Sequence, residues 1–251
     1  LKNDTEIKAL YAVHFSGNPT NQIKLKYLKE TYDIKILEDC AHSLGASFDD
    51  IKAGSCENSD CSIFSFHPVK HITTGEGGTI TTNSKEIYEK LSILRAHGMM
   101  KTPDMKPWEY EMRELGFNYR ITDFACALGM SQMKKLDRFI ARRQEIAKLY
   151  DETFSGTCIQ PLYTFTQNSS YHLYVVRVDF ENTKISKEEL FIKMRESGIA
   201  LQVHYIPINK QPYYKSLGYG DEYTPVMDRY YFECFSLPIF PALSDSEHEY
   251  V

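Results

Sequence analysis

The amino-acid sequence predicts an α/β fold in which an open, mainly parallel sheet is followed by a small α+β domain. Near its start, a β-prone run over residues 8–15 ends at a Gly-Asn-Pro turn, a helical pattern covers residues 20–32, and a short apolar strand follows at 34–37. A strand, a helix and a strand in this order imply two parallel strands joined by a right-handed crossover. After Gly156 the pattern changes to strand, helix and strand over residues 171–204, which indicates a second, smaller unit.

The remaining elements of the first domain are predicted by the same patterns. Short strands are expected at residues 61–66 and 79–82, with a polar loop that closes on glycines between them, and a helix at 85–96. In the helix over residues 20–32, the apolar positions at helical spacing are Ile23, Tyr27 and Leu28. In the helix over residues 85–96, they are Ile87, Leu91 and Leu94. Each helix therefore has one face that can pack against the sheet.

A long helical region over residues 121–150 leads from the first domain to the second. It is expected to contain two helices that meet near residues 131–136, with Thr122 or Asp123 as the N-cap. We place the domain boundary in this region, so that residues 1–148 form the large domain.

The small domain, residues 149–251, is expected to be α+β. Its helix covers residues 187–197, because Ser186 and Glu189 have the spacing of a capping box and Gly198 lies just past the last turn. The strands expected on either side of this helix are 171–178 and 199–204.

Composition and charge exclude several classes of function. With 251 residues, 42% of them apolar, the chain can bury a substantial core. A net charge of −5 argues against a nucleic-acid surface, and neither a run of about 18 apolar residues nor a signal-peptide pattern is visible. The six cysteines are scattered without C-x-x-C spacing, which fits neither a disulfide framework nor a zinc site. We therefore expect no nucleic-acid, membrane or metal partner, and reduced thiols in a cytoplasmic protein.

Lys70 is the first candidate for covalent chemistry. It follows the β-prone run at 61–66 and stands at the start of a loop that closes on Gly75, Gly77 and Gly78. A lysine amine that can lose its proton attacks carbonyl groups, as it does when it binds pyridoxal phosphate. A lysine beside a glycine turn is otherwise an ordinary solvated side chain, so the assignment needs a second element.

Asp39 supplies that second element. It falls where the apolar strand at 34–37 ends, and ligands of open α/β sheets bind at the carboxyl ends of the strands. A carboxylate there can keep the pyridine nitrogen of pyridoxal phosphate protonated, which makes the ring an electron sink. The alternative is that Asp39 only caps a helix. Together, Asp39 and Lys70 favour a pyridoxal-phosphate site.

Five segments of the chain resemble the DegT family of sugar-nucleotide aminotransferases. The segments are LEDCAHSLGA (37–46), FSFHPVKHITTGEGG (64–78), LRAHGM (94–99), LGFNYRITDFACALG (115–129) and QVHYIPI (202–208). They occur in the order found in the family. The resemblance implies an aspartate-aminotransferase-like fold (fold-type I pyridoxal-phosphate transferase), with a three-layer large domain and a small α+β C-terminal domain. It also implies a pyridoxal 5'-phosphate-dependent transaminase.

Within the family, the chain is most similar to the branch that serves the pseudaminic acid pathway. The segments that carry this finer resemblance are SIFSFHPVK, CALGMSQMKKLD and GIALQVHY. They imply transfer of an amino group from L-glutamate to C4 of a UDP-linked 4-keto-6-deoxy-N-acetylhexosamine. Another nucleotide-sugar 3- or 4-aminotransferase and a non-catalytic pyridoxal-phosphate-binding fragment or regulator remain alternatives. Sugar dehydratases of the family carry histidine in place of the lysine, so Lys70 favours amination.

The resemblance also assigns the contacts of the cofactor. Lys70 and Asp39 are expected to be the catalytic residues, and His42 is expected to lie against the cofactor ring. Ser65 corresponds to a serine that contacts the phosphate, and Asn118 to an asparagine that reaches the phosphate across a dimer interface. The chain is therefore expected to form a homodimer with shared active sites.

Four residues are candidate contacts of the UDP-sugar: Arg120, His204, Tyr205 and His172. Arginine suits a diphosphate because its planar fork donates two parallel hydrogen bonds. Many relatives have lysine after the His-Tyr pair, where this chain has Ile206, so a cation for the diphosphate is either missing or supplied elsewhere. The other aromatic residues of 205–235 are assigned to the core by default.

Members of the family have a long segment before the first strand of this chain. The chain ends where a final helix, capped by Ser244 or Asp245, is expected to begin. We therefore interpret it as a fragment that lacks the N-terminal part of the large domain and the last helix. Whether such a fragment binds the cofactor or dimerises is left open by the residues alone.

Overall fold

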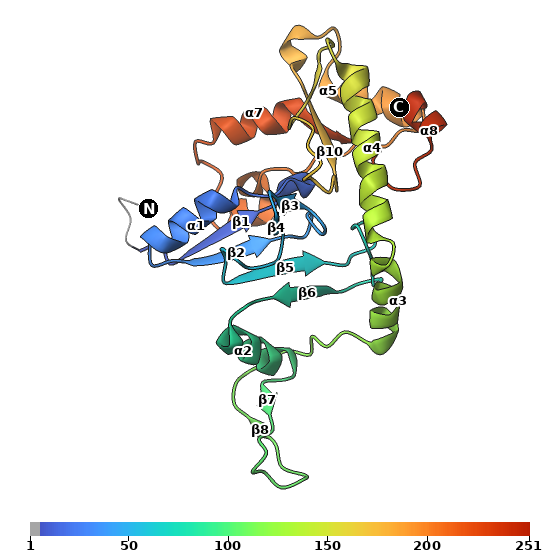
Figure 1. Cartoon of the computed structure of the whole chain (residues 1–251). Helices are drawn as coiled ribbons and strands as arrows, with labels where there is room; N and C mark the ends of the chain where they lie inside the picture. The colour runs from blue at the N-terminus through green and yellow to red at the C-terminus, as the bar shows by residue number, and fades with distance from the viewer. Residues whose placement is uncertain (1–5) are drawn as a thin grey trace. The chain divides into compact units, whose positions relative to one another are not determined.

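The computed structural model describes residues 6–251, which form two compact units (Figure 1). The first unit comprises residues up to Arg138 together with Asn168–Ser170, and the second comprises Phe139–Gln167 and Tyr171–Val251. The division falls within helix α4 (Leu136–Phe154), and the boundary expected after residue 148 lies further along the same helix. None of the helices in residues 6–251 combines the length and apolar character of a membrane span.

The first unit is built on a four-stranded sheet in the order β1-β2-β5-β6. The strands are β1 (Ala9–Val13), β2 (Lys35–Asp39), β5 (Cys61–Ser65) and β6 (Gly78–Thr81). β2 runs parallel to both β1 and β5, whereas β6 is antiparallel to β5. The predicted parallel strands and crossover are thus confirmed, and the carboxyl ends of β2 and β5 lie side by side.

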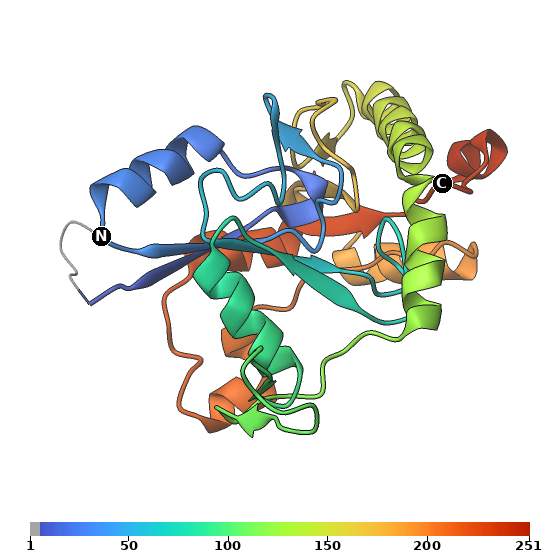
Figure 2. The ribbon, with the colours of Figure 1, turned by 60° about the horizontal axis from the view of Figure 1, so that its bottom comes forward.

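Helix α1 (Gln22–Thr31) forms the crossover between β1 and β2 and lies along one face of the sheet (Figure 2). It begins at Asn21, whose side chain accepts a hydrogen bond from the backbone N–H of Lys24 at 3.0 Å. Leu25 packs in a buried cluster with Ala12 and Ile36. The apolar face predicted for this helix was wrong at two positions, because Ile23 and Tyr27 are 68% and 55% exposed.

The first unit also contains short hairpins and two helices beyond α1. They are η1 (Phe15–Gly17), β3 (Ser47–Phe48), β4 (Ile51–Lys52), α2 (Lys85–Arg95), β7 (Met99–Met100), β8 (Glu111–Met112) and α3 (Asp123–Met133). Thr122 caps α3 by accepting from the backbone N–H of Ala125. The break between α3 and α4 lies within the predicted stretch 131–136.

Helix α3 is apolar on all sides but almost entirely exposed. Gly129 is its one buried residue, while Phe124 is 91% and Met130 68% exposed. A helix that is hydrophobic all round is normally buried, so this surface has the character of an interface.

The second unit contains a three-stranded antiparallel sheet in the order β11-β10-β9. The strands are β9 (Ile159–Pro161), β10 (Tyr174–Val178) and β11 (Cys234–Leu237). Its core joins Ile146 and Tyr150 of α4 to Val176 of β10 and Phe235 of β11. Helix α5 (Lys187–Glu196) has the predicted capping box of Ser186 and Glu189.

Two expectations for the second unit were wrong. Residues 199–204 do not form a strand; only Gln202 pairs with Ser236, as an isolated bridge. Beyond this pair His204 bonds to Ser236 Oγ and to the hydroxyl of Tyr230 instead of continuing a ladder. The aromatic residues of 205–235 are also mostly on the surface, with Tyr223 91% exposed.

The rest of the second unit consists of short helices. They are η2 (Phe180–Asn182), η3 (Ile208–Lys210), α6 (Pro212–Ser216), α7 (Pro225–Glu233) and α8 (Asp245–Tyr250). Ser244 caps α8, as expected from the sequence.

A buried guanidinium ties α4 to the second unit. Arg143 is 3% exposed and donates to the backbone oxygens of Tyr171, His172 and Ile239 at 2.9–3.2 Å. Burial lowers its pKa to about 10. The segment that leads into β10 is therefore anchored by a charged side chain.

Candidate active site

Asp39 is the last residue of β2, and its position is fixed from several directions. Its backbone oxygen accepts from the N–H of His14 at 3.0 Å, and the next N–H, of Cys40, donates to Ile63 of β5 at 2.8 Å. Its carboxylate accepts from the N–H of Ala41 at 3.0 Å, which forms a side-chain turn rather than a helix cap. The half-buried carboxylate is thus held at the carboxyl end of the sheet.

The neighbouring acid, Glu38, is 2% exposed and has a structural environment. Its carboxylate accepts hydrogen bonds from His14 Nε2 at 2.8 Å, Gln22 Nε2 at 2.7 Å and Ser59 Oγ at 2.5 Å, and from Ser62 Oγ at 3.3 Å. Burial by itself would raise the pKa of Glu38, but these bonds, the one from His14 foremost, together bring the pKa below its ordinary value.

This network was missed by the sequence reasoning. It joins β2 to the loop after β1, to α1 and to β5, through side chains that are distant in sequence. It also explains why α1 turns Gln22 toward the sheet and leaves Ile23 exposed. One feature of the sequence could have indicated it: Glu38 lies on a strand predicted to be buried, and a buried carboxylate requires hydrogen-bond donors around it.

Lys70 lies in the loop between β5 and β6, one strand away from Asp39. The loop is closed by backbone bonds from Phe66 to Gly77 and from Thr74 to Phe66, and the N–H of Lys70 donates to His67 at 2.9 Å. Burial lowers the pKa of the Lys70 amine, and the nearby Asp39 charge opposes this shift. An amine of lowered pKa beside a carboxylate can act as a nucleophile and as a proton carrier.

His42 and Ser65 are found near the same two strand ends. His42, three residues beyond Asp39, is 9% exposed, and its ring centroid lies 6.0 Å from that of Phe15. Ser65 ends β5, and its hydroxyl accepts from the N–H of His67 at 3.4 Å. The ends of β2 and β5 and the loops after them thus carry the predicted residues Asp39, His42, Ser65 and Lys70 at the same edge of the sheet.

Asn118 and Arg120 lie on an exposed strand-like segment that pairs with Ala96 at the end of α2. Arg120 Nη2 donates to Asn118 Oδ1 at 3.4 Å and lies 3.3 Å from His97 Nε2. Both side chains are open to solvent. They are thus free to contact a bound molecule or a second chain.

The other three predicted residues belong to the second unit. His172 precedes β10 and is 6% exposed. His204 Nδ1 lies 2.9 Å from Ser236 Oγ of β11, and the Tyr205 side chain is 56% exposed. Here the exposed ring of Tyr205 is the group most open to a ligand.

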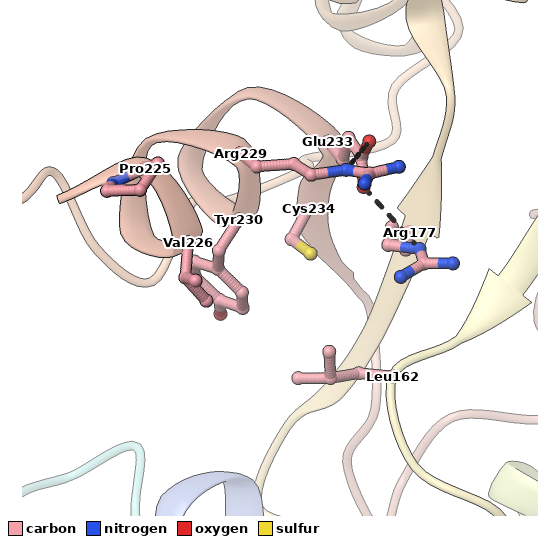
Figure 3. A pocket seen from close by; sticks show the side chains of 8 residues that line it. All are labelled: Leu162, Arg177, Pro225, Val226, Arg229, Tyr230, Glu233 and Cys234. Carbon is pink, nitrogen blue, oxygen red and sulfur yellow. Dashed lines mark hydrogen bonds and ion pairs between the residues drawn. The ribbon is translucent and has the colours of Figure 1, made fainter.

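The second unit also has a pocket of about 460 Å³ beside α7 (Figure 3). It is lined by Leu162, Arg177, Pro225, Val226, Arg229, Tyr230, Glu233 and Cys234. The Glu233 carboxylate lies 2.7 Å from Arg229 Nε and 3.5 Å from Arg177 Nε. This charge pairing is internal, and the pocket contains none of the predicted site residues. Across residues 6–251, no group of three His, Cys, Asp or Glu side chains is arranged to hold a metal ion.

Comparisons with known proteins identify the family of this chain. The model of the DegT/DnrJ/EryC1/StrS aminotransferase family matches residues 2–251. The UDP-4-amino-4,6-dideoxy-N-acetyl-beta-L-altrosamine transaminase of Campylobacter jejuni serotype O:23/36 is 38% identical over 253 residues, which cover 100% of this chain and 65% of that protein. The spore coat polysaccharide biosynthesis protein SpsC of Bacillus subtilis is 32% identical over 96% of this chain and 64% of that protein. The chain thus spans slightly less than two thirds of the length of each of these relatives.

Solved structures show the same fold. Helicobacter pylori PseC, an aminotransferase involved in the biosynthesis of pseudoaminic acid, superposes with a TM-score of 0.88 at 31% identity, over 96% of this chain and 64% of that one. A putative sugar aminotransferase of Streptococcus pneumoniae, Spr1654 in its PMP-form, gives a TM-score of 0.87 at 30% identity, over 98% and 68%. The predicted aspartate-aminotransferase-like α/β fold is confirmed, and the chain belongs to the DegT/DnrJ/EryC1/StrS aminotransferase family.

Proposed function

We propose that this protein is a pyridoxal-phosphate-dependent aminotransferase that acts on a nucleotide-linked keto sugar. The observation that carries the proposal is the pair formed by Asp39, at the end of β2, and Lys70, in the loop that follows the adjacent parallel strand β5. Burial lowers the pKa of this lysine, and the charge of Asp39 acts on it in the opposite direction. Family membership and the PLP-form and PMP-form structures of the Streptococcus pneumoniae relative support the same cofactor.

The residues present fit that cofactor. Lys70 would hold its aldehyde carbon, Asp39 its ring nitrogen and His42 its ring, while Ser65 and the Asn118 of a second copy would bind its phosphate. When bound, pyridoxal phosphate supplies an electron sink for the carbon that loses a proton. The half-buried Lys70 amine takes the proton from Cα of the amino donor and later delivers one to the sugar carbon that receives nitrogen.

The proposed substrates are L-glutamate and a UDP-linked 4-keto-6-deoxy-N-acetylhexosamine, aminated at C4. The named activity of the Campylobacter jejuni relative and the pathway of the Helicobacter pylori structure support a role in pseudaminic-type or surface-glycan biosynthesis. Arg120, His204, Tyr205 and His172 remain our proposed contacts for the UDP-sugar. Nucleotide-sugar substrates and free thiols are consistent with a cytoplasmic enzyme.

The substrate assignment can be tested directly. We expect the protein, supplied with pyridoxal phosphate, L-glutamate and the UDP-linked 4-keto sugar, to form 2-oxoglutarate and a UDP-amino sugar in equal amounts, measured by mass spectrometry. A 3-keto isomer serves as the comparison substrate. Preference for that isomer would favour another nucleotide-sugar aminotransferase. Cofactor binding without either product would favour the non-catalytic alternative.

We also propose that the protein works as a homodimer. Helix α3 presents an apolar surface that includes Phe124 and Met130, and the rings of Phe117 and Tyr119 stack at 4.7 Å next to it in sequence. Exposed apolar surface of this extent is typical of protein interfaces. Asn118 lies between the two stacked rings in sequence, so a partner that covers them would also meet Asn118.

Asn118 is then expected to act on the site of the partner copy. Mixing a Lys70→Ala protein with an Asn118→Asp protein, followed by subunit exchange, should restore activity, because both defects fall in one site and the other site is whole. Each parent homodimer carries its defect twice; Asn118→Asp sets a carboxylate against a phosphate, a like-charge contact. The control is the same mixing of two Lys70→Ala samples, which should stay inactive. No recovery after demonstrated exchange would place Asn118 in its own chain's site or outside any site.

A further inference from the structure

Three strand-end loops of the first unit meet at Ser170. The segment Asn168–Ser170 belongs to the first unit, although the residues before and after it belong to the second. Ser170 itself is completely buried. It therefore sits inside the first unit as an insertion from a distant part of the sequence.

Every hydrogen-bonding group of Ser170 contacts a different loop. Its N–H donates to the backbone oxygen of Gly17 at 3.1 Å, and its hydroxyl donates to the backbone oxygen of His42 at 3.2 Å. Its own backbone oxygen accepts from His71 Nε2 at 3.1 Å, so this ring nitrogen carries a proton. Two residues earlier, Asn168 accepts from the N–H of Ser47 at 3.0 Å.

Two of these loops adjoin the candidate catalytic residues, and the third follows β1. Gly17 follows β1, His42 is three residues beyond Asp39, and His71 is the residue after Lys70. The loop after Asp39 and the loop that bears Lys70 leave the sheet from adjacent strands. Further along, both loops are hydrogen-bonded to Ser170. The distance between the two loops is thus fixed by strand pairing where they begin and by Ser170 beyond that point.

We propose that Ser170 and His71 are positioning residues that hold the Lys70 amine in register with the Asp39 carboxylate. The catalytic roles of the Lys70 amine and the Asp39 carboxylate rest on the proposed function. The hydrogen bonds that connect their loops are a feature of the fold. His71 is 3% and His42 9% exposed, so water is poorly placed to replace a lost bond. A buried carbonyl without its donor is costly, and the loop bearing Lys70 would relax and admit water.

Three variants separate the contacts. Ser170→Ala removes only the hydroxyl bond to His42 and keeps both backbone bonds. His71→Leu removes the ring donor, and His71→Gln restores an N–H donor of similar reach. His248→Leu is the matched control, because His248 is also buried, at 7% exposure, but its ring packs at a tilt against Tyr150 of the second unit.

The first measurement needs no cofactor. The rate at which an amine-reactive label modifies Lys70 is followed against pH by peptide mapping, which gives the pKa of the folded protein's amine. Ser170→Ala releases the loop after Asp39, and His71→Leu releases the loop that bears Lys70. Since burial lowers the Lys70 pKa, entry of water beside either released loop should move the labelling midpoint to higher pH in both variants. His71→Gln and His248→Leu should keep the midpoint of the unchanged protein.

The second measurement is a titration with pyridoxal phosphate followed by absorbance. We expect about tenfold weaker binding for Ser170→Ala and for His71→Leu, each of which loses one buried hydrogen bond, with recovery in His71→Gln. If Ser170→Ala and His71→Leu melt at lower temperature but keep the Lys70 midpoint and the cofactor affinity, the contacts are merely structural and the proposal is overturned. If His71→Leu does not fold, Ser170→Ala decides by the same two criteria.

The two proposals fail in different ways. A protein that binds no pyridoxal phosphate would contradict the proposed function, yet its Lys70 labelling profile would still test the positioning role. A fully active enzyme whose Lys70 midpoint is unaffected by Ser170→Ala and by His71→Leu would contradict the positioning role alone.

Discussion

Replacing Lys70 by alanine is expected to abolish transamination, with a loss of at least about 10⁴-fold, the upper range for removal of a positioned acid–base group. The variant loses the amine that acts both as the nucleophile and as the proton carrier. The carboxylate of Asp39 cannot replace this amine. The measurement is product formation by mass spectrometry together with borohydride reduction of the cofactor-loaded protein. In the unchanged protein the reduced cofactor should map to the peptide that contains Lys70.

Lys85→Ala is the matched control for this experiment. The Lys85 side chain is 87% exposed at the start of α2 and forms a surface ion pair with Glu89, so its loss should leave activity and labelling unchanged. A reduced cofactor found on any lysine other than Lys70 would contradict the central assignment.

Asp39→Asn is expected to keep the fold and part of the cofactor while slowing both half-reactions by about 10²–10³-fold, as for removal of a preorganised electrostatic group. The amide retains an oxygen that can accept from the N–H of Ala41, so the turn after β2 survives. It cannot keep the pyridine nitrogen protonated, so the electron sink is weakened. Single-turnover rates of each half-reaction measure the effect, and near-normal rates would show that Asp39 only closes the turn.

The same variant should change the titration of Lys70 in a defined direction. The Asp39 carboxylate raises the pKa of the amine and partly offsets the lowering caused by burial. Without this charge the pKa falls further, so the labelling midpoint of the cofactor-free protein should move to lower pH. This is opposite to the shift expected from loosening the loop, which distinguishes an electrostatic from a positional effect.

Much of the site-bearing sheet could be predicted from local patterns. The strands around residues 34–37 and 61–66 are short apolar runs that end at polar residues, and the order strand, helix, strand fixed their parallel arrangement. Asp39 and Lys70 were predictable as neighbours because parallel strands end at the same edge. Thr122 as a cap and the Ser186 capping box depend on only a few adjacent residues, which is why they were confirmed.

The errors arose where distant contacts decide the structure. The side of α1 that faces the sheet is set by Gln22 bonding to Glu38, a polar contact that apolar periodicity does not detect. Residues 199–204 have strand-like composition but find one pairing partner, Ser236. Ser170 offered no local signal, because its role depends on loops about a hundred or more residues earlier.

The hydrogen bonds around Glu38 restrict which substitutions this protein can accept at position 38 and at its partner positions. An isosteric Glu38→Gln change would turn an amide N–H₂ toward groups that are themselves donors, at a cost of about 1–3 kcal/mol for each buried donor left unsatisfied. Loss of His14 or Gln22 alone would leave the buried Glu38 carboxylate without one of its hydrogen-bond donors. Substitutions at these positions are therefore tolerated as a set rather than one at a time, and an apolar residue at position 38 requires apolar partners at 14 and 22. Relatives that lack an acid at the position of Glu38 should also have exchanged the residues that donate to it.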